Sequence, residues 1–178
     1  MTIRATLESD RDEWTRALLA SEAMHAPWVP ARGDWGSPDE LFWNGLARHQ
    51  QGSAWRGVAV APDGRIAAWV NLNDVVRGVS HSANAGWSVN VEFAGQGVAT
   101  TAVMAMLDVA FAPEPRGVEL HRVACGIMPG NLRSLRVAEK CGFRREGYAP
   151  ELIRIAGKWE DHVLLAKLAR EHAPGAGP

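Results

Sequence analysis

The stretch Val89-Asn90-Val91-Glu92-Phe93-Ala94-Gly95-Gln96-Gly97-Val98-Ala99-Thr100 is typical of a strand followed by a glycine-rich turn and the start of a helix. The first amides of a helix have no intrahelical acceptor and carry partial positive charge, so a turn that exposes them to an anion makes a phosphate site. Glycines two apart permit the positive φ angles that such a turn needs. We therefore expect a phosphate-binding loop over residues 95–100.

Two nucleotide-binding motifs do not match this loop. A P-loop requires Lys and Ser or Thr directly after its last glycine, whereas Val98 and Ala99 follow Gly97. The dinucleotide fingerprint requires a third glycine where Thr100 stands, and no strand ending in an acid follows about twenty residues later. The phosphate therefore belongs to another kind of ligand.

A second strand and helix follow about thirty residues after the loop. Residues 121–127 alternate apolar with small or polar side chains, which predicts a strand with one buried face. Asn131 is placed to cap a helix that Gly142 ends, and Ser134 lies on the first turn of that helix. Three cations recur at a spacing that puts them on one side of the helix: Arg133, Arg136 and Lys140.

Periodicity and turn residues predict the remaining elements. A capping box at 37–40, with Pro at the first helical position, marks one helix start, and a Pro-Asp-Gly turn at 61–64 marks a hairpin. The expected strands are 3–7, 55–61, 65–73, 87–92, 121–127, 144–147 and 160–168. The expected helices are 10–24, 38–50, one from the loop to Pro113, and one starting at Asn131.

Several ordered motifs between residues 85 and 168 carry a family resemblance. They are Gly86-Trp87, Gly95-x-Gly97-x-Ala99-Thr100, Asn131-x-x-Ser134, Glu139-Lys140-Cys141-Gly142-Phe143, Glu146-Gly147 and Gly157-Lys158-Trp159-x-Asp161-His162. In these motifs the chain resembles the GNAT superfamily of acyl-CoA-dependent N-acetyltransferases, and within it the RimJ/RimL-like branch that acetylates protein N-termini. The segment 27–30, Pro-Trp-Val-Pro, is similar to a proline-flanked aromatic segment of that branch.

The resemblance implies an α+β fold of the three-layer α/β type. A mixed, mostly antiparallel twisted sheet would carry helices on both faces, and its central strand would be splayed from its neighbour to admit CoA. We expect a single GNAT domain over residues 1–172 and a disordered tail over the small, Pro/Gly-rich residues 173–178.

The resemblance also implies how the cosubstrate acetyl-CoA is bound. Backbone of the central strand would pair with the pantetheine arm, the 95–100 amides would hold the pyrophosphate, and Asn131 would contact the pantetheine. Ser134 stands where the family places a hydroxyl near the thioester sulfur, so we expect it to protonate the leaving thiolate. The expected cofactor-binding residues are Trp87, Val89, Val91, Gly95, Gln96, Gly97, Val98, Ala99, Thr100, Asn131, Ser134, Arg136 and Lys140.

The general base has no assignment in the sequence. The family often has acids where Asn84 and Thr101 stand, and a basic residue where Ala94 stands. Glu92, Asp74 and Asp161 are the acids near the site elements that we name as candidates. Trp28 and Trp35 are candidates for the wall of the acceptor pocket, with core packing as the alternative.

Composition and charge limit the kinds of partner and cofactor that we expect for this chain. A net charge of −1 and a pI near 6.6 argue against a nucleic-acid surface. No apolar stretch approaches the ~20 residues of a membrane span, and the scattered histidines imply no metal site. Cys125 and Cys141, on a predicted buried face and a helix end, indicate inert thiols in a reduced, cytoplasmic protein. We expect a monomer or a homodimer.

Four functions remain open from the sequence. The first is acetylation of a protein N-terminal α-amine by direct attack in a ternary complex. The second is acetylation of a small-molecule amine, such as an antibiotic or a polyamine. The third is a non-catalytic acyl-CoA-binding sensor, suggested by the acids missing at Asn84 and Thr101. The fourth is a structural domain, which the paired loop and helix cap disfavour.

Overall fold

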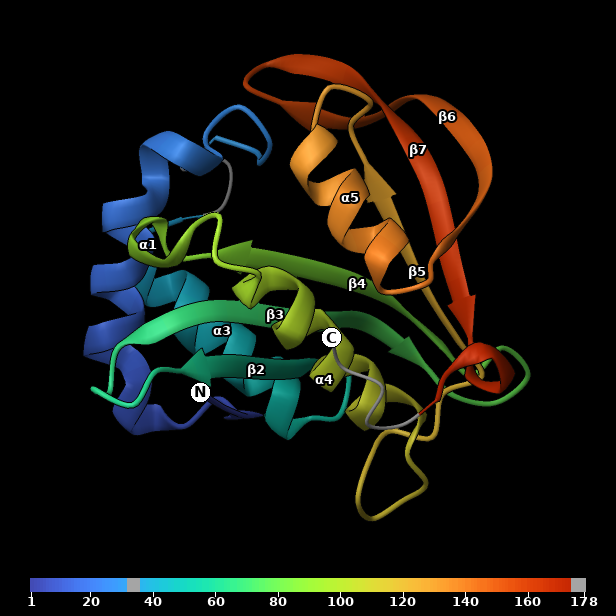
Figure 1. The fold of residues 1–178 in the computed structure, drawn as a ribbon, viewed down its shortest axis with the longest axis horizontal. Coiled ribbons are helices and arrows are strands. Elements are labelled where there is room, and N and C mark those ends of the chain that lie inside the picture. The colour runs from blue at the N-terminus through green and yellow to red at the C-terminus, as the bar shows by residue number, and fades with distance from the viewer. Residues whose placement is uncertain (32–35, 174–178) are drawn as a thin grey trace.

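A seven-stranded sheet forms the centre of the computed structural model, which describes residues 1–31 and 36–173 (Figure 1). The strand order is β1-β2-β3-β4-β5-β7-β6. The strands are β1 (Thr2–Ala5), β2 (Trp55–Val60), β3 (Ile66–Val76), β4 (Ser82–Val89), β5 (Arg122–Ile127), β6 (Arg144–Ile155) and β7 (Lys158–Leu168). All neighbours pair antiparallel except β4 and β5, which are parallel. The expected mixed sheet is confirmed.

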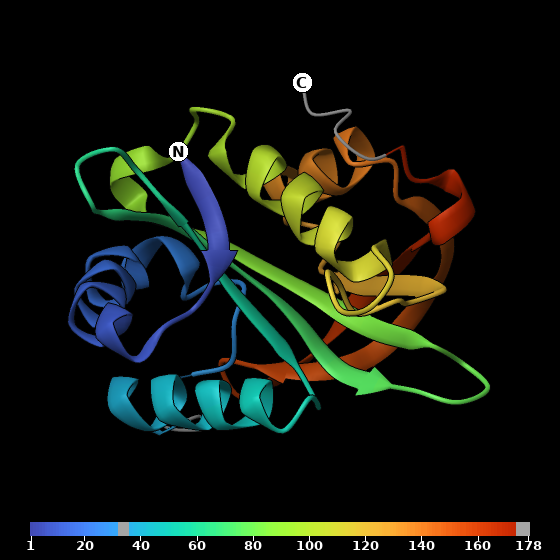
Figure 2. The same ribbon diagram turned by 90° about the horizontal axis from the view of Figure 1, so that it is seen from below.

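Helices cover both faces of this sheet (Figure 2). The helices α1 (Arg11–His25) and α3 (Pro38–Gln50) lie on one face, and α4 (Val98–Phe111) and α5 (Leu132–Lys140) lie on the other. Short 3₁₀ turns occur at η1 (Glu8–Asp10), η2 (Val91–Phe93) and η3 (Ala169–Glu171). This arrangement confirms the predicted GNAT fold of the three-layer α+β type.

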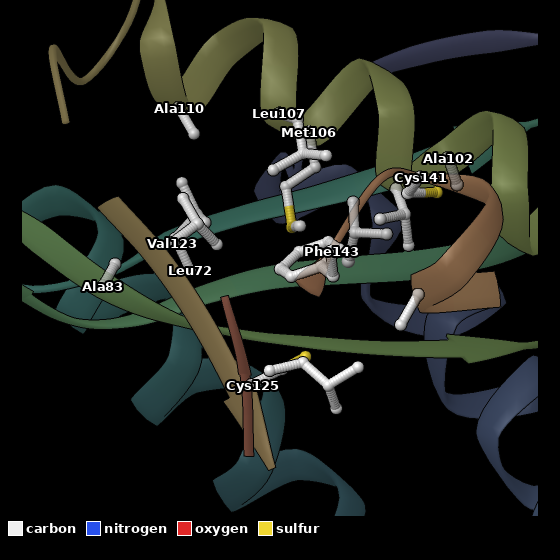
Figure 3. Close-up of a cluster of buried hydrophobic side chains, with 14 of the residues drawn as sticks. Leu72, Ala83, Ala102, Met106, Leu107, Ala110, Val123, Cys125, Cys141 and Phe143 are labelled. Carbon is white, nitrogen blue, oxygen red and sulfur yellow. The ribbon is translucent and has the colours of Figure 1, made fainter. Parts of the chain in front are cut away.

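The main core lies between the sheet and α4. Met106 and Leu107 of α4 are fully buried and point toward Leu72 and Val123 on the sheet, beside Phe143 (Figure 3). The face of β5 predicted to be buried is buried, because its alternating side chains all turn toward this helix layer. A smaller cluster with Ile66 and Trp69 packs beneath α1 on the opposite face.

The parallel strands β4 and β5 pair over a short distance and then separate. Their paired residues are Ser82 with Arg122, Ala83 with Val123 and Asn84 with Ala124. Beyond this point residues 85–89 of β4 pair only with β3, and residues 125–127 of β5 pair only with β7. The predicted splay beside the central strand is therefore confirmed, and it opens at Asn84.

The central strand differs in its bounds from the expected 87–92. It runs over Ser82–Val89 and is followed by the 3₁₀ turn Val91–Phe93. Asn90 is fully buried between them, where its Nδ2 donates to the Ile66 carbonyl at 2.8 Å and its Oδ1 accepts from the Glu92 amide at 3.1 Å. These bonds turn the chain out of the sheet, so the alternation seen at Val91 does not mark a strand.

The C-terminal hairpin is longer than expected. The sequence predicted strands at 144–147 and 160–168, whereas β6 and β7 meet at a turn over 156–157. Irregularities in the pairing after Arg145 and after Ala149 shift the faces of β6, and most of that strand is exposed. A strand without a regular buried face lacks the period-two pattern by which sequence reasoning finds strands.

Two predictions on the chain's ends and loops fall partly outside the described residues. Trp35 lies in the segment 32–35, and the predicted tail lies almost entirely in 174–178, neither of which the structure describes. Over the rest of the chain, no helix is long and apolar enough to cross a membrane.

Candidate functional site

The glycine loop before α4 presents bare backbone. Gly95 and Gly97 have φ angles of +79° and +80°, and a Cβ added at either position would meet no atom within 4 Å. Gly97 is the N-cap of α4 and provides no side-chain cap, while the Thr101 amide is bonded to the Gly97 carbonyl at 3.2 Å. The amides before Thr101 therefore have no acceptor within the helix and are free for an anion.

A cavity of about 710 Å³ runs from this loop through the gap between β4 and β5 to α5. Its volume lies within the range of ~300–1000 Å³ that is usual for small-molecule and cofactor sites. The residues predicted to bind cofactor that line it are Trp87, Val89, Gly95, Gly97, Val98, Ala99, Thr100, Asn131, Ser134, Arg136 and Lys140. Trp28, predicted for the acceptor wall, lines the same cavity and lies beside Gly130 of the β5–α5 loop.

Two residues of the predicted cofactor set do not line the cavity. Val91 is exposed in η2, and its amide donates to Ser21 Oγ of α1 at 3.0 Å. Gln96 turns back toward the preceding turn, where its Nε2 donates to the Glu92 carbonyl at 3.1 Å. The prediction that Val91 binds the cofactor assumes that the central strand continues through this residue. The structure ends that strand at Val89 and places Val91 in η2.

Helix α5 contributes polar and cationic groups. Asn131 caps the helix as predicted, with Oδ1 accepting from the Ser134 amide at 3.1 Å. Ser134 is half-buried at the cavity, next to Asn131. The three cations predicted to share a face, Arg133, Arg136 and Lys140, all line the cavity, and none forms an ion pair within the part of the chain that the structure describes. This wall suits a polyanion.

The three acids named as candidate bases lie outside the cavity. Glu92 bridges Arg16 at 3.2 Å and Arg65 at 2.6 Å. Asp74 pairs with Arg48 at 2.8 Å.

Asp161 accepts from the Tyr148 hydroxyl at 2.5 Å and from the Glu151 amide at 2.8 Å, and the Tyr148 bond lowers the pKa of that carboxyl. The geometry therefore favours structural pairing for all three acids, and their catalytic roles stay predictions without support.

A smaller cavity of about 250 Å³ lies between α1, α3 and the sheet. Its walls include the aromatic rings of Trp14, Phe42 and Trp69, and its polar lining includes Arg56 and Asn71. Both cavities are lined by His25, Val29, Pro30 and Ser88. The two cavities therefore meet beside the unpaired part of β4.

His25 is the functional candidate that sequence reasoning missed. Its Nε2 lies 2.8 Å from the Val89 carbonyl, which can only accept, so Nε2 carries the proton and Nδ1 is left as an acceptor. Burial lowers the pKa of this imidazole, and its ring meets Trp69 edge-on at 5.9 Å. A neutral histidine thus stands where the cavities meet. A lone His on the last turn of an amphipathic helix carries no sequence signal, because its partner is 64 residues away.

A second histidine and Cys125 also line the larger cavity, and Cys141 lies in the core. His162 of β7 is buried against the larger cavity, with Nδ1 at 2.9 Å from the Glu160 carbonyl. Burial raises the pKa of Cys125 to about 12 and that of Cys141 to about 11, so both thiols stay protonated. Among the described residues no group of three or more His, Cys, Asp or Glu side chains could hold a metal ion.

A splayed parallel pair, an uncapped helix start with a glycine loop, and a cationic helix across the gap together form a cavity suited to a phosphate-bearing ligand. The model of the acetyltransferase (GNAT) domain family matches residues 1–144 of this chain. The chain therefore belongs to the GNAT acetyltransferase family and is an enzyme of the N-acetyltransferase class.

Two relatives and a solved structure indicate which branch of the family this chain resembles. The chain is 33% identical over 176 residues to the [ribosomal protein uS5]-alanine N-acetyltransferase of Escherichia coli, with 95% of this chain and 89% of that protein covered. It is 40% identical over 112 residues to the probable N-acetyltransferase YjcK of Bacillus subtilis, covering 63% of this chain and 60% of that protein. The structure of Mycobacterium smegmatis RimJ in complex with CoA-disulfide superposes with a TM-score of 0.83 at 29% identity, covering 95% and 82% of the two chains. The RimJ/RimL resemblance is thereby confirmed.

Proposed function

We propose that this chain transfers the acetyl group of acetyl-CoA to the N-terminal α-amine of a peptide or protein. The observation that carries the proposal is the meeting of the two cavities at His25 and Ser88, beside the gap between β4 and β5. One cavity fits an elongated polyanion, and the other gives a second substrate access from the opposite face of the sheet. The E. coli relative, named as an alanine N-acetyltransferase of a ribosomal protein, supports a protein acceptor.

The larger cavity would hold acetyl-CoA. The free amides of the loop, up to Thr100, would bind the pyrophosphate, and the cations Arg133, Arg136 and Lys140 would add charge for the phosphates. The edge of β4 that faces the gap, at Trp87 and Val89, would bind the pantetheine arm, although the Val89 carbonyl already accepts from His25. Asn131 would contact the same arm from the α5 side.

The reaction is direct attack of the amine nitrogen on the thioester carbonyl carbon. The N–C bond forms, the C–S bond breaks, the thiolate takes a proton and the amine loses one. Ser134 would donate to the thiolate, whose ordinary pKa near ~8.5 makes this a modest demand. Water would relay the amine proton to a neutral acceptor. His25 Nδ1, where the two cavities meet, would be that acceptor.

The acceptor's own acidity favours an α-amine. Deprotonating an α-amine of pKa ~8 at pH 7 costs about 1.4 kcal/mol, whereas a lysine side chain of pKa ~10.4 costs about 4.6 kcal/mol. A site that relies on a water relay and a neutral histidine should therefore prefer the α-amine.

The test is acetylation of a short peptide that begins with Ala or Ser and contains an internal Lys. We expect mass spectrometry to locate the acetyl group on the α-amine, and the rate to rise with pH toward a plateau near ~8. The same peptide with a blocked N-terminus is the control and should stay unmodified. Modification mainly of the lysine, or turnover only with small amines such as polyamines, would contradict the proposal. Acetyl-CoA binding without turnover of any amine would instead favour the sensor.

A further inference from the structure

Arg56 of β2 is a buried cation with an incomplete set of partners. Its Nη1 donates to Asn73 Oδ1 at 2.7 Å, whereas its Nε is buried and has no hydrogen-bond partner among the described residues. Burial lowers the pKa of this guanidinium to about 10, so it is still charged at neutral pH. A buried donor without an acceptor is costly and calls for a functional explanation.

No acid within the described residues neutralises this charge. The carboxylate whose charge acts on Arg56 is that of Asp74, which is bound to Arg48 at 2.8 Å. Arg48 itself repels Arg56. A charge taken out of water is normally paired, and within residues 1–31 and 36–173 no carboxylate forms an ion pair with this cation on the wall of the cavity.

A glycine inside a helix makes room for the Arg56 side chain. A Cβ added at Gly45, in the middle of α3, would lie 3.3 Å from Arg56 Nε. Glycine is unfavourable inside a helix, so we attribute its presence here to the close approach of this guanidinium. Gly45, Arg56 and Asn71 all line the smaller cavity, while Nε itself is buried against α3.

We propose that the acceptor carries a carboxylate close to its amine, and that Arg56 binds this carboxylate through the terminal nitrogen turned away from Asn73. A hydrogen bond between a guanidinium and a carboxylate is stronger than one between neutral groups. The proposal rests on the proposed function, since it assumes that the smaller cavity receives the acceptor. The carboxylate can be an Asp or Glu side chain near a peptide N-terminus, or the α-carboxylate of a free amino acid.

The charge of Arg56 favours such an acceptor over a polyamine. Arg56 suits the acid end of the acceptor. A polyamine would instead meet a fixed cation in Arg56, which opposes its binding.

The test compares matched pairs that differ only in carboxylate against carboxamide. One arm uses peptides with Glu or Gln at the second or third position, and the other uses free amino acids and their amides. For wild type, we expect kcat/KM to be about 10-fold higher for the acid at one of these positions, as for a charge-assisted hydrogen bond. Calorimetric titration of the same pairs, with CoA present, should give the same preference in Kd and does not require turnover.

Three variants assign the preference to Arg56. Arg56→Met should bring the acid-to-amide ratio close to one, and Gly45→Ala should lower it, because the added Cβ would crowd the guanidinium. Arg77→Met removes an exposed cation that lines neither cavity and should keep the ratio. Unchanged acetyl-CoA affinity and a single cooperative unfolding transition would show that Arg56→Met folds despite the loss of the bond to Asn73.

Two results would overturn the proposal. One is equal kcat/KM and equal Kd for acid and amide throughout the wild-type series. The other is an acid preference that survives in Arg56→Met. If peptides are not substrates but free amino acids react faster than their amides, the peptide function fails and the role of Arg56 stands.

Discussion

In the proposed anion site, Gly97 would act through its backbone alone. Its φ of +80° is a conformation that side chains disfavour, and it begins α4 at the large cavity without a side-chain cap. Ser134 would act through its side chain, since its backbone amide is bonded to Asn131 while its hydroxyl would be the proton donor. The two residues therefore make separable predictions on binding and on turnover.

We expect Gly97→Val to weaken acetyl-CoA binding by about 10-fold or more, because a branched side chain blocks close approach of phosphate to backbone. Calorimetric titration measures the Kd. Gly64→Val is a matched control, since Gly64 has a similar φ of +88° and an equally open Cβ position but lies in the β2–β3 turn. Equal affinities in wild type and Gly97→Val would reject the loop as the phosphate site.

Ser134→Ala should lower kcat by about 10- to 10³-fold and leave the KM for acetyl-CoA nearly unchanged. The reason is that a proton donor to the leaving thiolate acts mainly in the transition state. Alanine is a good helix residue, and the amide bond to Asn131 does not involve the lost hydroxyl. Steady-state kinetics give both constants. A raised KM with an intact kcat would instead make Ser134 a binding residue.

At the scale of elements, Asn90 decides where the central strand ends. Its side chain joins β3, through the Ile66 carbonyl, to the first amides of η2. The turn that follows carries the chain toward the glycine loop, so the position of the loop depends on this one buried amide. Ser21 of α1 adds a bond to the Val91 amide from the other side of the sheet.

Asn90→Ala should destabilise the fold by roughly 2–3 kcal/mol, because two hydrogen bonds are lost and the Ile66 carbonyl is left buried without a side-chain donor. Urea unfolding followed by circular dichroism measures the change. Asn84→Ala is the comparison variant, because Asn84 is exposed and makes only a 3.5 Å contact with Asp74, and it should change stability by less than about 0.5 kcal/mol. Similar small changes in both variants would show that Asn90 does not fix the turn.

At the scale of the whole molecule, stability should fall as the pH falls below about 6.5. Burial lowers the pKa values of His25 and His49 in the folded chain. As the pH falls, the unfolded chain therefore binds protons at these histidines before the folded chain does. Both rings have a role that the charged form would disturb: His25 leaves Nδ1 as an acceptor, and His49 Nδ1 accepts from the Arg56 amide at 3.1 Å. The stability present above pH 6.5 is lost progressively on acidification.

Calorimetry between pH 5 and 8 should show the unfolding temperature dropping toward the acid side. Replacing both His25 and His49 by Gln should flatten this dependence. His121→Gln, at an exposed site, should leave it as in wild type. An unchanged slope in the double variant would show that other groups dominate the acid response.

The amino-acid sequence by itself determined the local parts of the site. The loop glycines, the Asn131 cap and the Ser37 capping box each depend on hydrogen bonds or φ angles within about four residues, so their motifs are readable without the fold. The family resemblance also predicted the splay between β4 and its neighbour, and the short pairing of β4 with β5 confirms it.

Tertiary structure alone decided what surrounds the reacting groups. His25 meets the Val89 carbonyl across 64 residues, and the acids Glu92 and Asp74 pair with arginines from other elements and leave the site. The buried Nε of Arg56, which has no hydrogen-bond partner among the described residues, follows from the packing of α3 on β2, with a glycine at the contact. These features depend on which side chains the fold brings into contact and which it leaves without a partner. The spacing of residues along the chain does not predict such contacts.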